Sequence, residues 1–129
     1  MMKRTLIKDR LQQTADLFGL HFPMTLEPTV YLFAEHLSPD YRGGYWHFYA
    51  LENDGFYMSP DQDPFTVTSD NGFSGTLTGD AFGITACLYA YSHLSFRPEL
   101  TEVCGRHYHL LRDFALDHRE ARAIMAATD

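Results

Sequence analysis

Histidine and cysteine have the widest chemical range of the side chains in this sequence, because both bind metal ions and both serve in nucleophilic catalysis. The chain of 129 residues has seven histidines and two cysteines. The densest group lies at residues 104–109, where Cys104 and His107 stand three positions apart on an expected helix and share a face. His109 points to another face, and no second pair follows at zinc-finger spacing. The sequence therefore predicts no metal site, and we expect these histidines to serve helix packing or the surface.

The other arrangements that could carry catalysis are incomplete. A cysteine nucleophile needs a nearby histidine, an orienting acid and an oxyanion hole, but Cys87 and Cys104 both fall in helical patterns and are expected to be buried thiols. The run 72–75, Gly-Phe-Ser-Gly, lacks the spacing of a serine nucleophile elbow and follows a turn. Two pairs of acids could act in acid–base or Mg²⁺ chemistry but are better explained as solvated groups: Asp61 with Asp63, and Asp113 with Asp117. No glycine-rich phosphate loop is present, so we expect no enzymatic activity, no catalytic residue and no cofactor.

Aromatic side chains are concentrated in residues 45–49, which read Tyr-Trp-His-Phe-Tyr. Such residues can stack on the bases of single-stranded nucleic acid, but proteins of that kind also carry many cations, and Arg42 is the only one close by. The alternative is a hairpin whose aromatic rings build the core. Alternation along a strand would turn Trp46 and Phe48 toward that core.

The elements that must position these residues follow from the periodicity of apolar side chains. Helical spacing predicts helices over about 5–18, 28–37, 78–94, 99–116 and 119–127, with an extended connector over 20–23. Alternating patterns and turn residues predict strands over 45–51, 56–58, 65–68 and, more weakly, 73–77. Because the strands follow one another, we expect an α+β protein. It would be a single domain over residues 1–129, with a small antiparallel meander of three to four strands flanked by about five helices.

Negative charge is unevenly distributed along the chain. The net charge is −7, and residues 27–80 contain nine acids against Arg42 alone, a net of −8. Such a surface disfavours binding to DNA phosphates and would suit a basic protein partner, although acidity also serves solubility. No apolar run approaches the roughly 20 residues that cross a bilayer. We therefore expect a soluble, cytoplasmic protein without a membrane partner.

Several short blocks of the sequence form a specific pattern. The most specific block is Pro-Asp-Tyr at 39–41 followed by Gly-Gly-Tyr-Trp-His-Phe-Tyr at 43–49 and Gly-Phe-Tyr-Met at 55–58. Later blocks are Asn-Gly-Phe at 71–73, Asp-Ala-Phe-Gly-Ile at 80–84 and Tyr-His-Leu-Leu-Arg-Asp-Phe-Ala at 108–115. Together these blocks resemble the ArdB/KlcA antirestriction family, and the resemblance covers residues from about 17 to 129.

The resemblance implies a bacterial protein, often carried on plasmids or other mobile elements, that relieves type I restriction–modification of incoming DNA. It implies no catalytic site, metal or cofactor. The expected partner is the type I restriction–modification machinery or an associated host protein, reached directly or indirectly. A net charge of −7 is too sparse for a full DNA mimic, since duplex DNA carries one charge per roughly 1.7 Å. The alternative function is that of a nucleic-acid-associated accessory or regulatory protein of a mobile element.

We expect the interaction surface to combine the solvent face of the aromatic strand with the acidic turns around it. Asp129 is added because a negative charge just past a helix C-terminus is disfavoured by the helix dipole. Asp129 therefore either takes part in binding or simply lies in a frayed tail. The expected surface residues are Asp40, Tyr45, His47, Tyr49, Glu52, Asp54 and Asp129.

Overall fold

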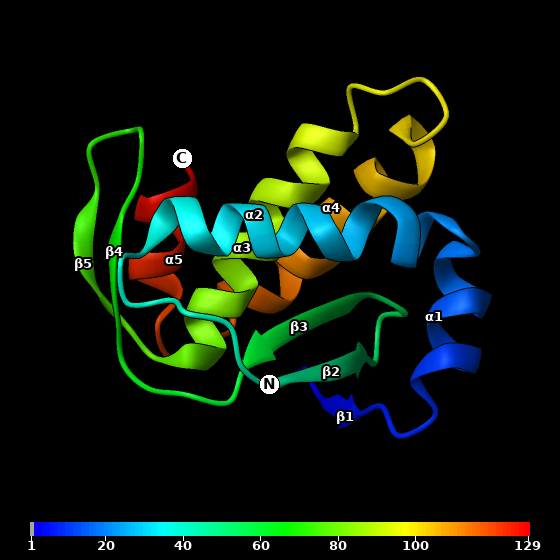
Figure 1. Ribbon diagram of the computed structural model, residues 1–129, viewed down its shortest axis with the longest axis horizontal. Helices are drawn as coiled ribbons and strands as arrows, with labels where there is room; N and C mark the ends of the chain where they lie inside the picture. The colour runs from blue at the N-terminus through cyan, green and yellow to red at the C-terminus, as the bar shows by residue number, and fades with distance from the viewer. Residues whose placement is uncertain (1) are drawn as a thin grey trace.

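The computed structural model describes residues 2–129, which run through one strand, three helical segments, four strands and three helices (Figure 1). The strands are β1 (Arg4–Leu6), β2 (Trp46–Leu51), β3 (Phe56–Pro60), β4 (Phe65–Thr68) and β5 (Ser74–Leu77). The helical segments are α1 (Arg10–Phe18), η1 (Phe22–Leu26), α2 (Glu27–Leu37), α3 (Gly79–Leu94), α4 (Thr101–Leu116) and α5 (Ala121–Thr128). The predicted α+β class and the five α-helices are confirmed.

The N-terminal segment differs from the helix predicted over residues 5–18. β1 pairs antiparallel with β2, so that Thr5 lies opposite Ala50. Ile7 follows the strand, donates its N–H to the Phe48 carbonyl at 2.8 Å and is buried. α1 begins only after Asp9, whose side chain accepts a hydrogen bond from a backbone N–H of the first helical turn. The prediction failed for residues 5–9 because the strand pairing and the burial of Ile7 depend on a segment far along the chain.

The connector predicted as extended over residues 20–23 is instead part of a helical turn. η1 is one turn of π-helix that leads directly into α2. Phe22, at its start, is buried and packs edge-to-face on Phe48 and Phe56, with ring centroids 5.5 Å apart in each case. This packing holds Phe22 in helical backbone although a proline follows, and Pro23 lies in the first turn, where its missing N–H removes no helical hydrogen bond.

The strands form two sheets and not one meander. The first sheet has the order β1-β2-β3, with Phe48 opposite Met58, while β4 and β5 pair with each other. Pro60 ends β3 and Pro64 precedes β4, and a proline cannot donate to a strand ladder, so the chain leaves the first sheet between them. In Figure 1 the β4–β5 hairpin lies beside α5, away from the three-stranded sheet.

The helix α3 lies at the centre of the protein and packs on β3, α2, α4 and α5. Twelve of its 16 residues are buried, so the helix is enclosed on nearly all sides and not along one face alone. A Cβ atom at Gly83 would lie 2.4 Å from the Met58 carbonyl oxygen, which makes glycine necessary where α3 meets β3. Trp46 and Phe48 are buried in the same core, as the alternation along their strand predicted.

Candidate functional site

A cleft lined mostly by polar side chains lies where β1, the end of β3, the start of α3 and the connection between α4 and α5 meet. It consists of two adjoining cavities of about 390 and 230 Å³, and Arg4, Asp80 and Arg119 line both. We call this hollow the polar cleft. His47 and Tyr49 line the smaller cavity, so the cleft includes two of the residues expected at the interaction surface.

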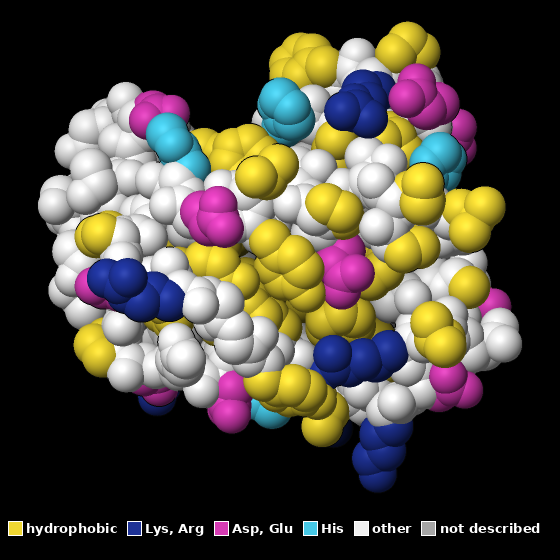
Figure 2. Space-filling view, in the orientation of Figure 1, with side chains coloured by type: hydrophobic (Ala, Val, Ile, Leu, Met, Phe, Trp, Pro, Cys, Tyr) yellow, Lys and Arg dark blue, Asp and Glu magenta, His cyan; other side chains and the backbone are white. Residues whose placement is uncertain are grey.

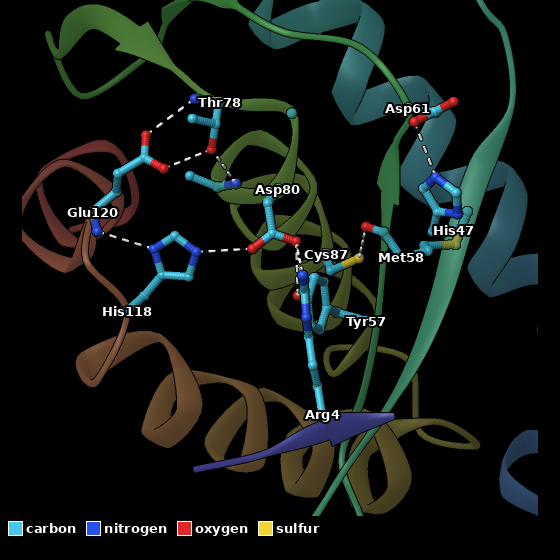
Figure 3. Close-up of polar contacts among 12 residues, drawn as sticks. Arg4, His47, Tyr57, Met58, Asp61, Thr78, Asp80, Cys87, His118 and Glu120 are labelled. Carbon is cyan, nitrogen blue, oxygen red and sulfur yellow. Dashed lines mark hydrogen bonds and ion pairs between the residues drawn. The ribbon is translucent and has the colours of Figure 1, made fainter. Parts of the chain in front are cut away.

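Asp80 is the centre of the hydrogen bonds in the polar cleft (Figure 3). It lies in the first turn of α3, where the helix dipole favours a carboxylate, and Thr78 caps this helix. Its Oδ1 accepts hydrogen bonds from the Tyr57 hydroxyl, at 2.8 Å, and from the Arg4 guanidinium. Its Oδ2 lies 2.8 Å from Nε2 of His118. Both carboxylate oxygens are therefore engaged by side chains that come from three other parts of the chain.

Backbone contacts select the tautomer of His118. The N–H of Glu120 donates to Nδ1 of His118 at 3.0 Å, so in the neutral ring the proton is on Nε2, which donates it to Asp80. The Glu120 carboxylate in turn accepts hydrogen bonds from the Thr78 backbone N–H at 3.0 Å and from the Thr78 hydroxyl at 2.6 Å. The connection between α4 and α5 is therefore fixed to the start of α3 at two points.

The electrostatics of the cleft keep Asp80 ionised. Burial by itself raises the pKa of this carboxyl, but hydrogen bonds from His118 and Tyr57, together with Arg4, outweigh burial and hold the pKa below its usual range. Burial and the neighbouring carboxylate raise the pKa of the Tyr57 hydroxyl, which stays neutral as a donor. A general base needs a free lone pair and a pKa near the working pH. The pKa of Asp80 does not meet this requirement, because three donors stabilise its charge, and the arrangement suits a fixed charge in a recognition surface.

Tyr45, His47 and Tyr49 lie together on the solvent side of β2, and we call them the aromatic row. The ring of His47 meets Tyr45 edge-on at 5.2 Å and lies 6.3 Å from the ring of Tyr49. Nε2 of His47 is 3.1 Å from Oδ1 of Asp61, and the Arg4 guanidinium lies over the Tyr49 ring at 4.1 Å. The aromatic row therefore continues into the polar cleft through the His47–Asp61 contact and a cation–π contact.

The four acids expected at the same surface are not brought together. Asp40 accepts a hydrogen bond from the Thr66 backbone N–H at 2.7 Å, and Glu52 accepts one from the Lys3 backbone N–H at 2.7 Å. Both carboxylates therefore help to hold strands in place. Asp54 is exposed in the β2–β3 turn with φ of 73° and lines a separate cavity of about 200 Å³.

The structure gives Asp129 a local role. The Asn71 side-chain amide, from the β4–β5 turn, donates to the carbonyl oxygens of Ala126 and Asp129, at 2.9 Å in each case. These bonds satisfy carbonyls at the C-terminal end of α5, where no partner exists within the helix. The backbone carbonyl of Asp129 is therefore held by Asn71, while the part of the Asp129 side chain in binding stays a prediction.

Sequence reasoning missed most of the polar cleft. Arg4 precedes one predicted helix, Asp80 falls near the start of another, and His118 falls between two more, so the predicted elements do not bring the three together. Asp80 stands 76 residues after Arg4 and 38 before His118. No local spacing rule joins positions so far apart, and the one local signal was an acid in the first turn of a long helix.

The metal and thiol predictions can be compared with the part of the chain that the structure describes. Within residues 2–129 no group of three or more His, Cys, Asp or Glu side chains is placed to hold a metal ion. Cys87 and Cys104 are buried free thiols, as predicted, and burial raises their pKa to about 12 and about 11. Both thiols are therefore protonated at neutral pH and poor nucleophiles.

Comparison with known proteins places the chain in one family. Residues 39–129 match the family model described as antirestriction protein. The chain is 39% identical to antirestriction protein KlcA of Escherichia coli over 125 residues, covering 93% of this chain and 88% of that protein. It is 37% identical to an uncharacterized protein, YfjX, of Escherichia coli strain K12 over 110 residues, covering 82% of this chain and 72% of that protein.

A solved structure has the same fold. It superposes with a TM-score of 0.90 at 37% sequence identity and covers 99% of this chain and 95% of its own. This solved structure is one of the KlcA and ArdB proteins, which are described as having a novel fold and antirestriction activity against type I DNA restriction systems in vivo but not in vitro.

Proposed function

The chain belongs to the ArdB/KlcA antirestriction protein family, and from this we propose that it relieves type I restriction of incoming DNA by binding a protein, without catalysis. The observation that carries the proposal is the solved relative, which shares the fold over nearly the whole chain and shows this activity in cells. The polar cleft supplies a surface that is fixed in shape and charge, as a binding protein requires.

The chemistry of the described residues supports binding over catalysis. Both carboxylate oxygens of Asp80 accept hydrogen bonds, and the pKa of Asp80 is lowered. Both ring nitrogens of His118 also have hydrogen-bond partners. Cys87 and Cys104 are buried. The lowered pKa of Asp80 makes it a weak base at neutral pH, and the two buried thiols lack access to a substrate.

The distribution of charge supports a discrete protein contact over mimicry of DNA. Asp40 and Glu52 are engaged by backbone N–H groups, and Asp80 is paired with Arg4. Arg119 stands in the same cleft. DNA presents an unbroken series of phosphates at roughly 1.7 Å of axis per charge, and this surface mixes both signs with aromatic rings.

The partner we propose is the type I restriction–modification machinery or a host protein associated with it. The relatives' activity in vivo but not in vitro favours an indirect route, in which a cellular component absent from the purified reaction is needed. We place the contact on the aromatic row and the adjoining side chains of Asp61 and Arg119. Tyr45 is 60% exposed and is the most accessible ring of the aromatic row. Tyrosine and arginine are common at the energetic centres of protein interfaces.

We also propose that residues 1–129 act as a single domain in the bacterial cytoplasm. One hydrophobic cluster contains buried residues from α1, η1, α2, β2 to β5, and α3 to α5, which supports a single domain. Among residues 2–129, none of the helices has both the length and the apolar character that crossing a bilayer requires.

Phage plating on restricting and non-restricting hosts, with and without the protein, tests the proposed function. We expect higher plating only on the restricting host. Equal plating in all four cases would contradict the antirestriction function and favour the alternative, an accessory or regulatory protein of a mobile element.

Surface variants then test the proposed contact. Tyr45→Ala, Asp61→Lys and Arg119→Glu should each reduce the relief, while Phe96→Ala, on an exposed ring in the loop between α3 and α4, should not. Reversing Asp40, Glu52 and Asp54 to lysine and changing Asp129→Asn examine the four expected acids, and full relief in folded variants would show that these acids are not part of the contact. If the first three variants fold and retain full relief, the aromatic row and polar cleft are not the contact surface.

A further inference from the structure

A second hollow lies between α1, η1 and β2, apart from the polar cleft. Its volume is about 440 Å³, and most of its wall is formed by the apolar side chains of Leu11, Ala15, Leu20, Phe22 and Phe48. We call it the α1–η1 groove. It shares no lining residue with the polar cleft and takes no part in the proposed antirestriction contact.

Large apolar side chains project into solvent at the edge of this groove. Leu11 is 87% exposed, Leu20 is 80% exposed, and Met24, in the same turn as Pro23, is 75% exposed. Figure 2 shows apolar side chains spread over the face of the protein where α2 and η1 lie. Single exposed leucines are ordinary on a protein surface, but several beside an apolar hollow indicate a surface that another protein covers.

One cation and one carboxylate stand in the wall of the groove, Arg10 and Glu27. Arg10 is held in place, because its guanidinium lies over the Phe48 ring at 4.1 Å and donates to the Tyr45 hydroxyl at 2.8 Å. Glu27 accepts one hydrogen bond from the Tyr31 hydroxyl through Oε2. Within residues 2–129 neither Arg10 nor Glu27 forms an ion pair, so both charges can meet a partner.

We propose that the α1–η1 groove binds a second copy of this chain across a two-fold axis. In such an interface the same patch of both copies meets, so the patch must complement itself. This patch carries a hollow and projecting leucines side by side, and Leu20 of each copy fills the groove of the other. It also carries one charge of each sign, so that Arg10 of one copy faces Glu27 of the other. A partner of one charge sign would leave either Arg10 or Glu27 beside a like charge or without compensation.

The dimer has a consequence for the aromatic row. Arg10 joins the groove to Tyr45 through a hydrogen bond and a cation–π contact at 4.8 Å. Two-fold pairing through the groove therefore brings the Tyr45 end of each aromatic row to the edge of the interface. The pairing itself is independent of the antirestriction proposal, since it concerns a different hollow and is measured without a restriction assay.

Sedimentation equilibrium and light scattering of the purified chain over a range of concentrations test the dimer. We expect the average mass to rise from one copy toward two as concentration increases. Leu20→Glu should shift this transition to concentrations higher by about tenfold or more. Phe96→Glu alters a side chain that is 85% exposed outside the groove and should leave the transition unchanged. A wild-type chain that stays a monomer throughout would overturn the proposal, as would equal effects of the two variants.

Cross-linking locates the interface. Cys87 and Cys104 are buried, so Leu20→Cys adds a single accessible thiol to the described chain. We expect a flexible bis-maleimide to join two Leu20→Cys chains into a covalent dimer, and to join Phe96→Cys chains far less. The circular dichroism of each variant confirms that it folds. If Phe96→Cys cross-links and Leu20→Cys does not, the copies meet elsewhere and the groove is not the interface.

Discussion

Nε2 of His118 lies 2.8 Å from Oδ2 of Asp80, and this contact joins the connection between α4 and α5 to the first turn of α3. A second link, from the Thr78 hydroxyl to Glu120 at 2.6 Å, lies next to it. The residues that hold the polar cleft in shape therefore also determine how α5 packs. Changes at Asp80 should alter stability and the candidate site together.

Asp80→Asn should lower the free energy of unfolding at neutral pH by roughly 2–3 kcal/mol. In asparagine an NH₂ group replaces one of the two carboxylate oxygens. This NH₂ group would face either the donors of Tyr57 and Arg4 or the donor of His118, and it cannot accept their hydrogen bonds. Urea unfolding at pH 7 measures the loss. Asp113→Asn, which changes an exposed helix carboxylate, is the matched control and should have little effect. Equal stabilities of the two variants would contradict the role given to Asp80.

The pH dependence of stability in acid should report Asp80. Because the folded pKa of Asp80 lies below its ordinary value, the stability that it contributes is present above the unfolded pKa and is lost as pH falls through the folded pKa. Unfolding curves of wild type and Asp80→Asn between pH 5 and about pH 2 should therefore converge as the pH falls. A constant gap over this range would show that the charge of Asp80 is not what stabilises the fold.

His107 should destabilise the fold in mild acid. It is buried between the rings of Phe18 and Tyr91, and burial, with the nearby charge of Arg106, lowers its pKa to about 4. The unfolded chain binds the proton more readily, so stability is complete above about pH 6.5 and declines as pH falls toward 4, by on the order of 2 kcal/mol.

His107→Leu tests this effect, since leucine keeps the site apolar and removes the titration. Its free energy of unfolding should change less between pH 8 and pH 4.5 than that of wild type. His109→Gln, at an exposed imidazole on the same helix, is the control and should keep the wild-type profile. If His107→Leu also keeps that profile, the acid sensitivity arises from other groups.

Two glycines in helices should respond to alanine in opposite directions. At Gly83 a Cβ atom would lie 2.4 Å from the Met58 carbonyl oxygen, so Gly83→Ala should force α3 away from β3 and cost roughly 2–3 kcal/mol. At Gly105 nothing lies within 4 Å, so Gly105→Ala should stabilise α4 by about 0.5–1 kcal/mol. Thermal unfolding measures both changes, and a Gly83→Ala protein as stable as wild type would contradict the close packing.

Asn71→Ala should loosen the end of α5. The variant loses the donors to the Ala126 and Asp129 carbonyls, and we expect a loss of about 1–2 kcal/mol together with faster amide hydrogen exchange near residue 129. Asn71→Asp keeps the acceptor that binds the Phe73 N–H but not the donor, so it separates the two roles. Unchanged exchange in both variants would show that Asn71 does not hold the helix end.

Local signals predicted a large part of this fold. Pro28 marked the start of α2, where Glu27 and Pro28 form the first turn. The Asp-Gly turn predicted the β2–β3 hairpin, although the left-handed residue is Asp54, with φ of 73°, and not the following glycine. Alternation along the predicted strand 45–51 assigned Trp46 and Phe48 to the core and Tyr45 to the solvent. These features depend on neighbouring residues and on burial, which a sequence displays directly.

The remaining features depend on distant partners. β1 has three residues, and its strand character comes from pairing with β2, which a helical pattern at residues 5–18 concealed. The separation of β4 and β5 from the first sheet depends on how the chain turns at Pro60. The polar cleft combines Arg4, Asp80 and His118, whose proximity is a result of the complete fold. Physical rules that act over a few residues do not reach such combinations.

The contacts of Asp80 also set an order for folding during synthesis. Arg4 leaves the ribosome first, Asp80 follows 76 residues later, and His118 follows after another 38. Domains generally fold as they are synthesised from the N-terminal end, and contacts of large sequence separation form late. The polar cleft therefore closes only after His118 has been made, and until then the carboxylate of Asp80 lacks its partner from the connection between α4 and α5. A nascent chain that ends before His118 cannot present the finished surface.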